Sequence, residues 1–164
     1  MPVPLSAFEE IYRRHGHRCP MSTLGGRLGY AASRHVADCP RALQAVYHAR
    51  TCAVDGIEHT TGCTLAGGDL VVKDEGRHVL TLVCGECGEG VEVALRESTL
   101  DLAADYRRVG AELERLRPLM GAAEIEFRER QREAALDVLL HRLRTLPEEV
   151  LLTVRPLTAE VREG

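Results

Sequence analysis

The spacing of the apolar residues changes at Leu100, and this change limits most strongly the folds that the chain can adopt. Before this residue, short stretches with helical spacing alternate with short strand-like stretches. After it, long amphipathic helices are predicted over 100–117 and 121–145, with Arg and Glu three and four residues apart. A chain of 164 residues has room for one hydrophobic core. We therefore predict an α+β protein with one domain over 1–155 and a loose tail over 156–164.

The first part of the chain contains a glycine-rich helix and several strands. Pro20 suits a first helical turn, and Cys39-Pro40 ends the helical pattern that follows it. Because Gly25, Gly26 and Gly29 lie within this helix, we expect another part of the chain to approach its backbone closely. The remaining predictions are a helix over 52–61 and strands over 43–49, 70–72, 78–83, 91–95 and 150–154.

Charge and composition argue against several classes of function. The net charge is −4, basic residues are interleaved with acidic ones, and Trp is absent, so we expect no phosphate-binding face and no base-stacking surface. No apolar stretch reaches the length of about eighteen residues that spans a bilayer, and residues 1–10 lack a signal-peptide pattern. We therefore expect a cytoplasmic protein that binds neither nucleic acid nor membranes. Its six cysteines are then candidates for metal binding or redox chemistry.

The run HGHRC at 15–19 places two imidazoles and a thiol close together in the sequence. In an extended segment alternate side chains point the same way, so His15, His17 and Cys19 can share one face. Imidazole nitrogens and thiolates are ligands of zinc-like ions, and a helix beginning at Pro20 would stabilise a Cys19 thiolate. The alternative is an exposed histidine loop followed by a buried cysteine.

A second group of candidates lies at the two ends of the helix predicted over 52–61. Along a straight helix Cys52 and Cys63 are roughly 16 Å apart, so only one of them can lie beside His17 and Cys19. Cys52 is at the helix start, where the dipole favours a thiolate, whereas Cys63 is better explained as a small buried residue. The predicted metal ligands are therefore His17, Cys19 and Cys52.

Cys84 and Cys87 form a Cys-x-x-Cys pair between two predicted strands. One such pair supplies only two of the four ligands of a structural zinc, so a disulfide or half of a shared metal site is its functional interpretation. A purely structural role is the alternative. Cys39 carries no functional signal.

Four motifs occur in a fixed order in this chain: HGHRCP at 15–20, TCAVDG at 51–56, TGCT at 61–64 and DLVVKDEGRHV at 69–79. Together they resemble the E-subunit family of formylmethanofuran dehydrogenase. The resemblance implies an antiparallel sheet packed against helices. It also implies one cavity lined by seven side chains, namely His15, His17, Cys19, Cys52, Cys63, Lys73 and His78.

Two features depart from the pattern of this family. Many members carry a C-terminal treble-clef zinc finger, whereas no cysteine follows Cys87 here, so the chain resembles the core alone. The Cys84/Cys87 pair falls where the family pattern has no cysteines. The scattered cysteines do not match iron–sulfur spacings either, so we do not expect this chain by itself to be the dehydrogenase.

Three hypotheses follow, and whether the protein is an enzyme stays open. In the first, His17, Cys19 and Cys52 hold zinc or another divalent transition metal. Its candidate catalytic residues are Cys63, Lys73 and His78. In the second, a thiol redox or sulfur-handling protein uses Cys19 with Cys52 or Cys63. In the third, a non-catalytic accessory subunit uses its long helices to form a homodimer or to join an oxidoreductase complex.

Overall fold

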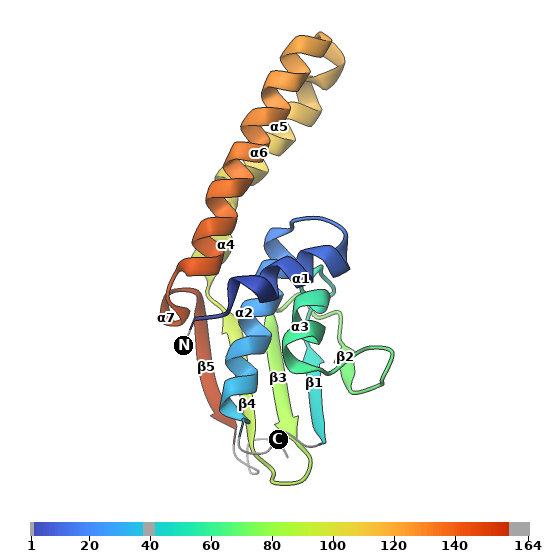
Figure 1. Ribbon diagram of the computed structural model, residues 1–164, viewed down its shortest axis with the longest axis vertical. Helices are drawn as coiled ribbons and strands as arrows, with labels where there is room; N and C mark the ends of the chain where they lie inside the picture. The colour runs from blue at the N-terminus through green and yellow to red at the C-terminus, as the bar shows by residue number, and fades with distance from the viewer. Residues whose placement is uncertain (1, 38–41, 158–164) are drawn as a thin grey trace.

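A computed structural model describes residues 2–37 and 42–157, so Cys39 lies outside the described residues. Its centre is one five-stranded sheet with the strand order β2-β1-β3-β4-β5 (Figure 1). The strands are β1 (Leu43–Tyr47), β2 (Leu70–Val72), β3 (Val79–Cys84), β4 (Gly90–Leu95) and β5 (Leu152–Leu157). Along β3, buried and half-buried residues alternate, as expected for a strand with one face on the core. The predicted α+β class is confirmed.

One strand pair of the sheet is parallel. β1 and β2 pair in the same direction, whereas β1–β3, β3–β4 and β4–β5 are antiparallel. The helix α3 (Ala53–Thr61) lies between β1 and β2 in the chain, and such a crossover returns the backbone to the direction in which it started. The predicted antiparallel sheet is thus confirmed as a mostly antiparallel one, with β1–β2 as its single parallel pair among the described residues.

α2 (Pro20–His35) and α3 lie side by side against the sheet, and α1 (Leu5–His15) packs on both of them (Figure 1). α2 contacts β3, β4 and β5, and it also contacts α1 and α3. Its apolar side chains are buried in the main core together with those of the sheet, as Leu24, Leu28 and Ala32 show. This central position explains why so much of α2 is buried, including its glycines.

The glycines of α2 allow α3 to pack directly against its backbone. A Cβ atom on Gly25 would overlap the carbonyl oxygen of Ala53, and one on Gly29 would overlap the side chain of Thr60. Gly56 of α3 meets the backbone of Gly26 in the same way. The predicted close approach is thus confirmed. Because the contacts advance together along both helices, α2 and α3 run in the same direction and begin side by side.

The two helices α5 (Ala104–Leu116) and α6 (Ala122–Thr145) form a hairpin that projects from the body (Figure 1). The turn η1 (Arg117–Leu119) joins them, and the short helix α4 (Glu97–Asp101) precedes them. The buried residues of α6 all lie in its second half, nearest the body. There the Arg27 guanidinium of α2 donates hydrogen bonds to the last carbonyls of the hairpin, those of Leu143, Arg144 and Leu146.

Several predicted boundaries shift. α1 was not predicted, α2 ends at His35 rather than at Cys39, and β1 ends at Tyr47. The strand predicted over 150–154 begins later, because Pro147 starts the helical turn α7 (Glu148–Leu151) before β5. β5 continues through Leu157, so its last two residues fall within the predicted tail; 158–164 lie outside the described residues.

The helices of the described residues were also compared with the requirements for crossing a lipid bilayer. None is both long enough and apolar enough to do so.

Candidate metal centre

The connection between α1 and α2 carries the first cluster of candidate ligands. His15 is the last residue of α1, and Gly16 ends that helix in the left-handed conformation with φ of 97°. This conformation favours glycine, since a side chain would be strained there. Cys19 is the extended N-cap residue of α2, and Pro20 occupies the first turn. The segment is therefore a tight turn between helices rather than the extended run that we assumed.

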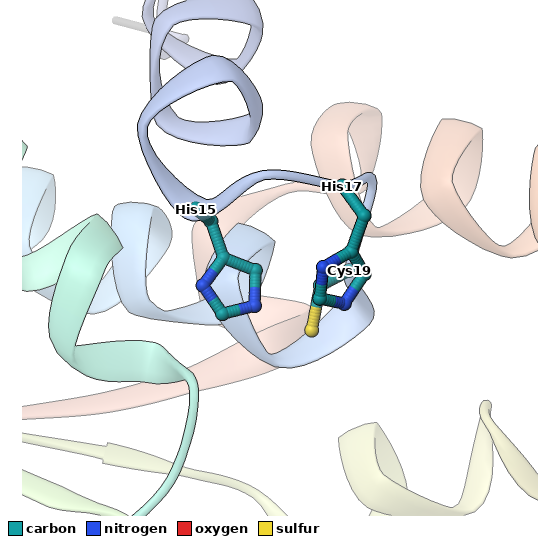
Figure 2. Close-up of side chains that lie close together, drawn as sticks. All are labelled: His15, His17 and Cys19. Atoms are coloured by element: carbon teal, nitrogen blue, oxygen red, sulfur yellow. The ribbon is translucent and has the colours of Figure 1, made fainter.

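This turn nevertheless brings the three predicted side chains together, as Figure 2 shows. One ligand atom from each of His15, His17 and Cys19 lies within 4.8 Å of the other two. The two imidazole rings have their centroids 4.4 Å apart. Ligand atoms around a tetrahedral zinc ion are about 3–4 Å apart, given bond lengths of about 2.0–2.3 Å. The cluster is thus close to the size that one ion requires.

The environment of His15 fits a metal ligand. Its Nδ1 atom lies 2.6 Å from a carboxylate oxygen of Asp55, to which it donates a hydrogen bond. Its Nε2 atom is buried and has no hydrogen-bond partner among the described residues. A carboxylate that fixes one imidazole nitrogen and leaves the other for the ion is the usual arrangement behind a zinc-bound histidine. The donor set and the unpartnered nitrogen therefore fit a bound divalent ion.

Asp55 is a supporting residue whose function was not predicted from the sequence. It lies in the first turn of α3, where its charge suits the helix dipole. The Arg14 Nε atom lies 3.9 Å from an Asp55 carboxylate oxygen, and its Nη2 atom lies 2.6 Å from a carboxylate oxygen of Glu58. The Glu58 carboxylate in turn accepts a hydrogen bond from the backbone N–H of Leu65. Asp55 is thus held in place from two sides.

Cys52 lies beside Cys19 but outside the group of three. It is the N-cap residue of α3, just as Cys19 is that of α2, and the glycine contact places these two helix ends together. Cys52 is an exposed residue, but partial desolvation raises the pKa of its thiol, and the neighbouring Cys19 thiol raises it further. The metal-free protein therefore favours the protonated thiol at Cys52.

Cys63 lies at the other end of α3. It follows Gly62, which ends the helix, and it is only 1% exposed. Burial raises the pKa of its thiol, and its backbone N–H bonds the Thr61 hydroxyl. It borders a separate pocket of about 470 Å³ that Asp69 also lines. Cys63 is thus not part of the His15/His17/Cys19 cluster, and its catalytic role stays a prediction.

His78 and Lys73 both lie near β1 but in different surroundings. The Nδ1 atom of His78 is 3.5 Å from the Tyr47 hydroxyl, which lies 2.9 Å from the hydroxyl of Thr51, the residue before Cys52. A chain of hydroxyls therefore leads from His78 toward the Cys52 end of α3. Lys73 bonds Tyr47 through its backbone N–H, and its side chain is exposed. Catalytic roles for His78 and Lys73 stay predictions.

Cys84 and Cys87 lie in the hairpin between β3 and β4. Cys84 is buried, Cys87 is exposed, and the Cys87 backbone N–H lies 3.5 Å from the Cys84 sulfur. Gly88 follows with a positive φ of 79° and bonds the Cys84 carbonyl. This hydrogen bond closes a five-residue turn, which is distant in sequence from both ends of α3.

Comparisons with known proteins point to one family. A family model described as "FmdE, Molybdenum formylmethanofuran dehydrogenase operon" matches residues 14–153. The crystal structure of an FmdE-like protein of the tungsten formylmethanofuran dehydrogenase type, from Syntrophus aciditrophicus, has a TM-score of 0.55. It is 24% identical, and the match covers 93% of this chain and 71% of that one. This similarity shows a shared fold.

A curated relative from Archaeoglobus fulgidus, called a probable S-adenosyl-L-methionine-binding protein, is 33% identical over 86 residues. These residues make up 48% of this chain and 24% of that relative, so the chain spans a small part of its length. The family match, in contrast, includes His15, His17, Cys19 and Cys52 and extends over most of the chain. This chain belongs to the FmdE family.

Proposed function

We propose that this chain is a metal-binding protein that holds one zinc-like divalent ion with His15, His17 and Cys19. The observation that carries the proposal is the buried Nε2 atom of His15, which has no partner among the described residues while Asp55 fixes its other nitrogen. A buried nitrogen without a partner costs about 1–3 kcal/mol, and a bound ion would remove this cost. The proposed ligands contain His15 in addition to the predicted His17 and Cys19.

Cys52 is proposed as the residue beside the open position of the ion. Three protein ligands leave a fourth position for water or substrate, which is the arrangement of catalytic zinc sites. Cys52 lies outside the group of three whose ligand atoms gather within 4.8 Å of one another, which argues against a fourth protein ligand. A bound ion at such a site supplies Lewis-acid chemistry, and His78 approaches the same region through Tyr47 and Thr51.

Metal analysis of tag-free protein, purified without added metal, tests this proposal. We expect about one equivalent of ion in the wild type and almost none in Cys19→Ser or His15→Ala. Cys87→Ser is the matched control, because Cys87 lies in the β3–β4 turn, and it should keep the ion. An unchanged ion content in Cys19→Ser with loss in Cys87→Ser would move the site to the Cys84/Cys87 turn and disprove the proposal.

A second candidate function rests on the contact between Cys19 and Cys52. Two adjacent thiols can form a disulfide, releasing two protons and passing two electrons to an external disulfide such as oxidised glutathione. The raised pKa of Cys52 slows its attack, so we rank this function second. Loss of two titratable thiols in wild type but not in Cys52→Ser, in protein without metal, would favour it over the metal site.

We also propose that the α5–α6 hairpin binds a partner, either a second copy of the chain or another member of an oxidoreductase complex. Large apolar side chains are exposed on it, with Leu119 82%, Phe127 53% and Val138 61% exposed. Phe127 and Val138 are eleven residues, or about three turns, apart on α6, so they lie on one face of it and can contact the same partner. Light scattering tests this: the wild type should be a dimer and Phe127→Glu/Val138→Glu a monomer. A monomeric wild type would exclude the homodimer.

A further inference from the structure

A small apolar pocket borders the candidate metal centre. It lies between the start of α2 and the helices α4, α5 and α6, and its volume is about 160 Å³. Engineered cavities of about 150 Å³ accept a benzene molecule, so this pocket has room for an apolar body of about six carbon atoms. Its apolar walls include Met21, Leu24, Leu100, Ala103 and Leu143.

The pocket offers few groups for a polar ligand. The Thr99 side chain lines it, but its hydroxyl already donates to the Leu151 carbonyl at 2.6 Å. Burying a hydroxyl-rich ligand here would leave its polar groups without partners. Sugars and nucleotides are therefore poor candidates, and an apolar ligand body is favoured.

Two of the residues that line the pocket indicate the kind of ligand that it binds and how the ligand is oriented. Cys19 is one of the three proposed metal ligands and also lines the pocket, so the pocket and the proposed metal centre share this residue. Arg107 is exposed, and no ion pair to it is found within 2–37 and 42–157. The next residue, Arg108, lies 3.6 Å from Asp105. An uncompensated guanidinium is well suited to bind a carboxylate through two parallel hydrogen bonds.

We propose that this pocket, which shares Cys19 with the metal centre, binds a small carboxylate with an apolar body. Its carboxylate pairs with Arg107, and its body lies against Leu100 and Leu143 with the far end toward Cys19. This inference rests on the proposed metal-binding function. It adds the chemical class of a ligand bound beside the ion, which neither the family match nor the ligand cluster specifies.

Titration calorimetry of the zinc-loaded full-length protein with straight-chain carboxylates, from acetate to octanoate, tests the pocket. Each added methylene should strengthen binding about fourfold until the body fills the pocket near hexanoate, and no further. Arg107→Leu should weaken hexanoate binding about tenfold, whereas the matched control Arg108→Leu should leave it unchanged. Ala103→Leu fills the pocket and should abolish binding without changing the circular dichroism spectrum or the metal content.

A separate measurement tests whether a ligand in the pocket lies beside the metal ion. In cobalt-loaded protein, hexanoate should change the visible spectrum in wild type but not in Ala103→Leu. Equal affinities of Arg107→Leu and Arg108→Leu, no dependence on chain length, or an unchanged cobalt spectrum would each overturn the inference. Metal analysis decides independently whether the proposed function fails, and hexanoate titration of metal-free protein still decides whether the pocket binds carboxylates.

Discussion

Two helix pairs of this protein differ in how their members are held together. α2 and α3 touch through their backbones at Gly25 and Gly56, and at Gly29 the backbone of α2 meets the side chain of Thr60. The α5–α6 hairpin buries Leu113 and is held near its tip by partly exposed ion pairs, such as Arg117–Glu129 at 3.1 Å and Arg128–Glu112 at 3.5 Å. The first pair is buried under α1 and against the sheet, and the second extends into solvent (Figure 1).

This difference shows which part of the molecule has a fixed geometry. A backbone contact permits little sliding, so it fixes the helix starts that carry Cys19 and Cys52. Exposed ion pairs contribute only about 0–1 kcal/mol each, and many side-chain arrangements satisfy them equally well. We conclude that the candidate site depends on the first pair, while the second is free to adapt its surface to a partner.

The sharpest test exchanges one glycine for alanine in each pair. Gly25→Ala places a methyl group on the Ala53 carbonyl and should lower the free energy of unfolding by about 3 kcal/mol, with weaker binding of the ion because α3 carries Asp55. Gly110→Ala in α5 is the matched control, because its nearest neighbour would be Arg132 Cδ at 3.6 Å. It should be neutral or stabilise the protein by up to about 1 kcal/mol. Urea unfolding measures both; similar losses would contradict the comparison.

A smaller effect is expected when the support of His15 is removed. Asp55→Ala takes away the carboxylate that fixes Nδ1 and should weaken zinc binding by about 10–100-fold, while the fold is kept. Glu75→Ala is the control, because it removes a carboxylate from His48 at 2.9 Å, outside the ligand cluster. Competition with a chromophoric chelator measures the affinity. Equal zinc affinities in both variants would show that Asp55 does not support a ligand.

The buried Cys63 should make stability fall at alkaline pH. Its folded pKa is raised by burial, so the folded state holds this proton more firmly than the unfolded state. The stability that it contributes is therefore fully present below the ordinary thiol pKa and is lost as pH rises through the folded pKa. In melting curves from pH 7 to 10.5, Cys63→Ala should decline less steeply than wild type. Parallel declines would contradict this assignment.

The smallest effect is expected on the hairpin. Arg130→Gln removes the exposed i,i+4 pair with Glu126, 3.0 Å apart, and should change the free energy of unfolding by less than about 0.5 kcal/mol. The same substitution should not alter metal content. Chemical unfolding at low and at 0.5 M salt measures it, and a loss above about 1 kcal/mol would show that the hairpin surface is not energetically independent.

The sequence predicted α2, α3 and the β3–β4 hairpin well, because their local signals agree with their tertiary roles. Glycines within a helical pattern indicated close packing, and alternation around a turn indicated paired strands. The α1 helix was missed, although Phe8, Ile11 and Tyr12 have helical spacing and are buried. No side chain caps its start, and Pro2 and Pro4 precede it, so its N-terminal signal is weak.

The candidate site was predicted only in part, for a geometric reason. His15, His17 and Cys19 are close in sequence, so any compact turn keeps them close in space. Asp55 is forty residues away from His15, and only the packing of α1 and α2 against α3 brings it to the Nδ1 atom. A long-range contact of this kind has no local sequence signal, which explains why its supporting role was not predicted.

The compact turn from His15 to Cys19 weakens the thermodynamic linkage between metal binding and folding. Because all three proposed ligands lie within one short segment, the unfolded chain can present them to an ion as well. Binding to the unfolded state subtracts from the stability that a ligand adds by mass action. Zinc should therefore raise the melting temperature by less than the amount calculated from its affinity for the native protein alone. A chelator should remove the ion without unfolding the chain.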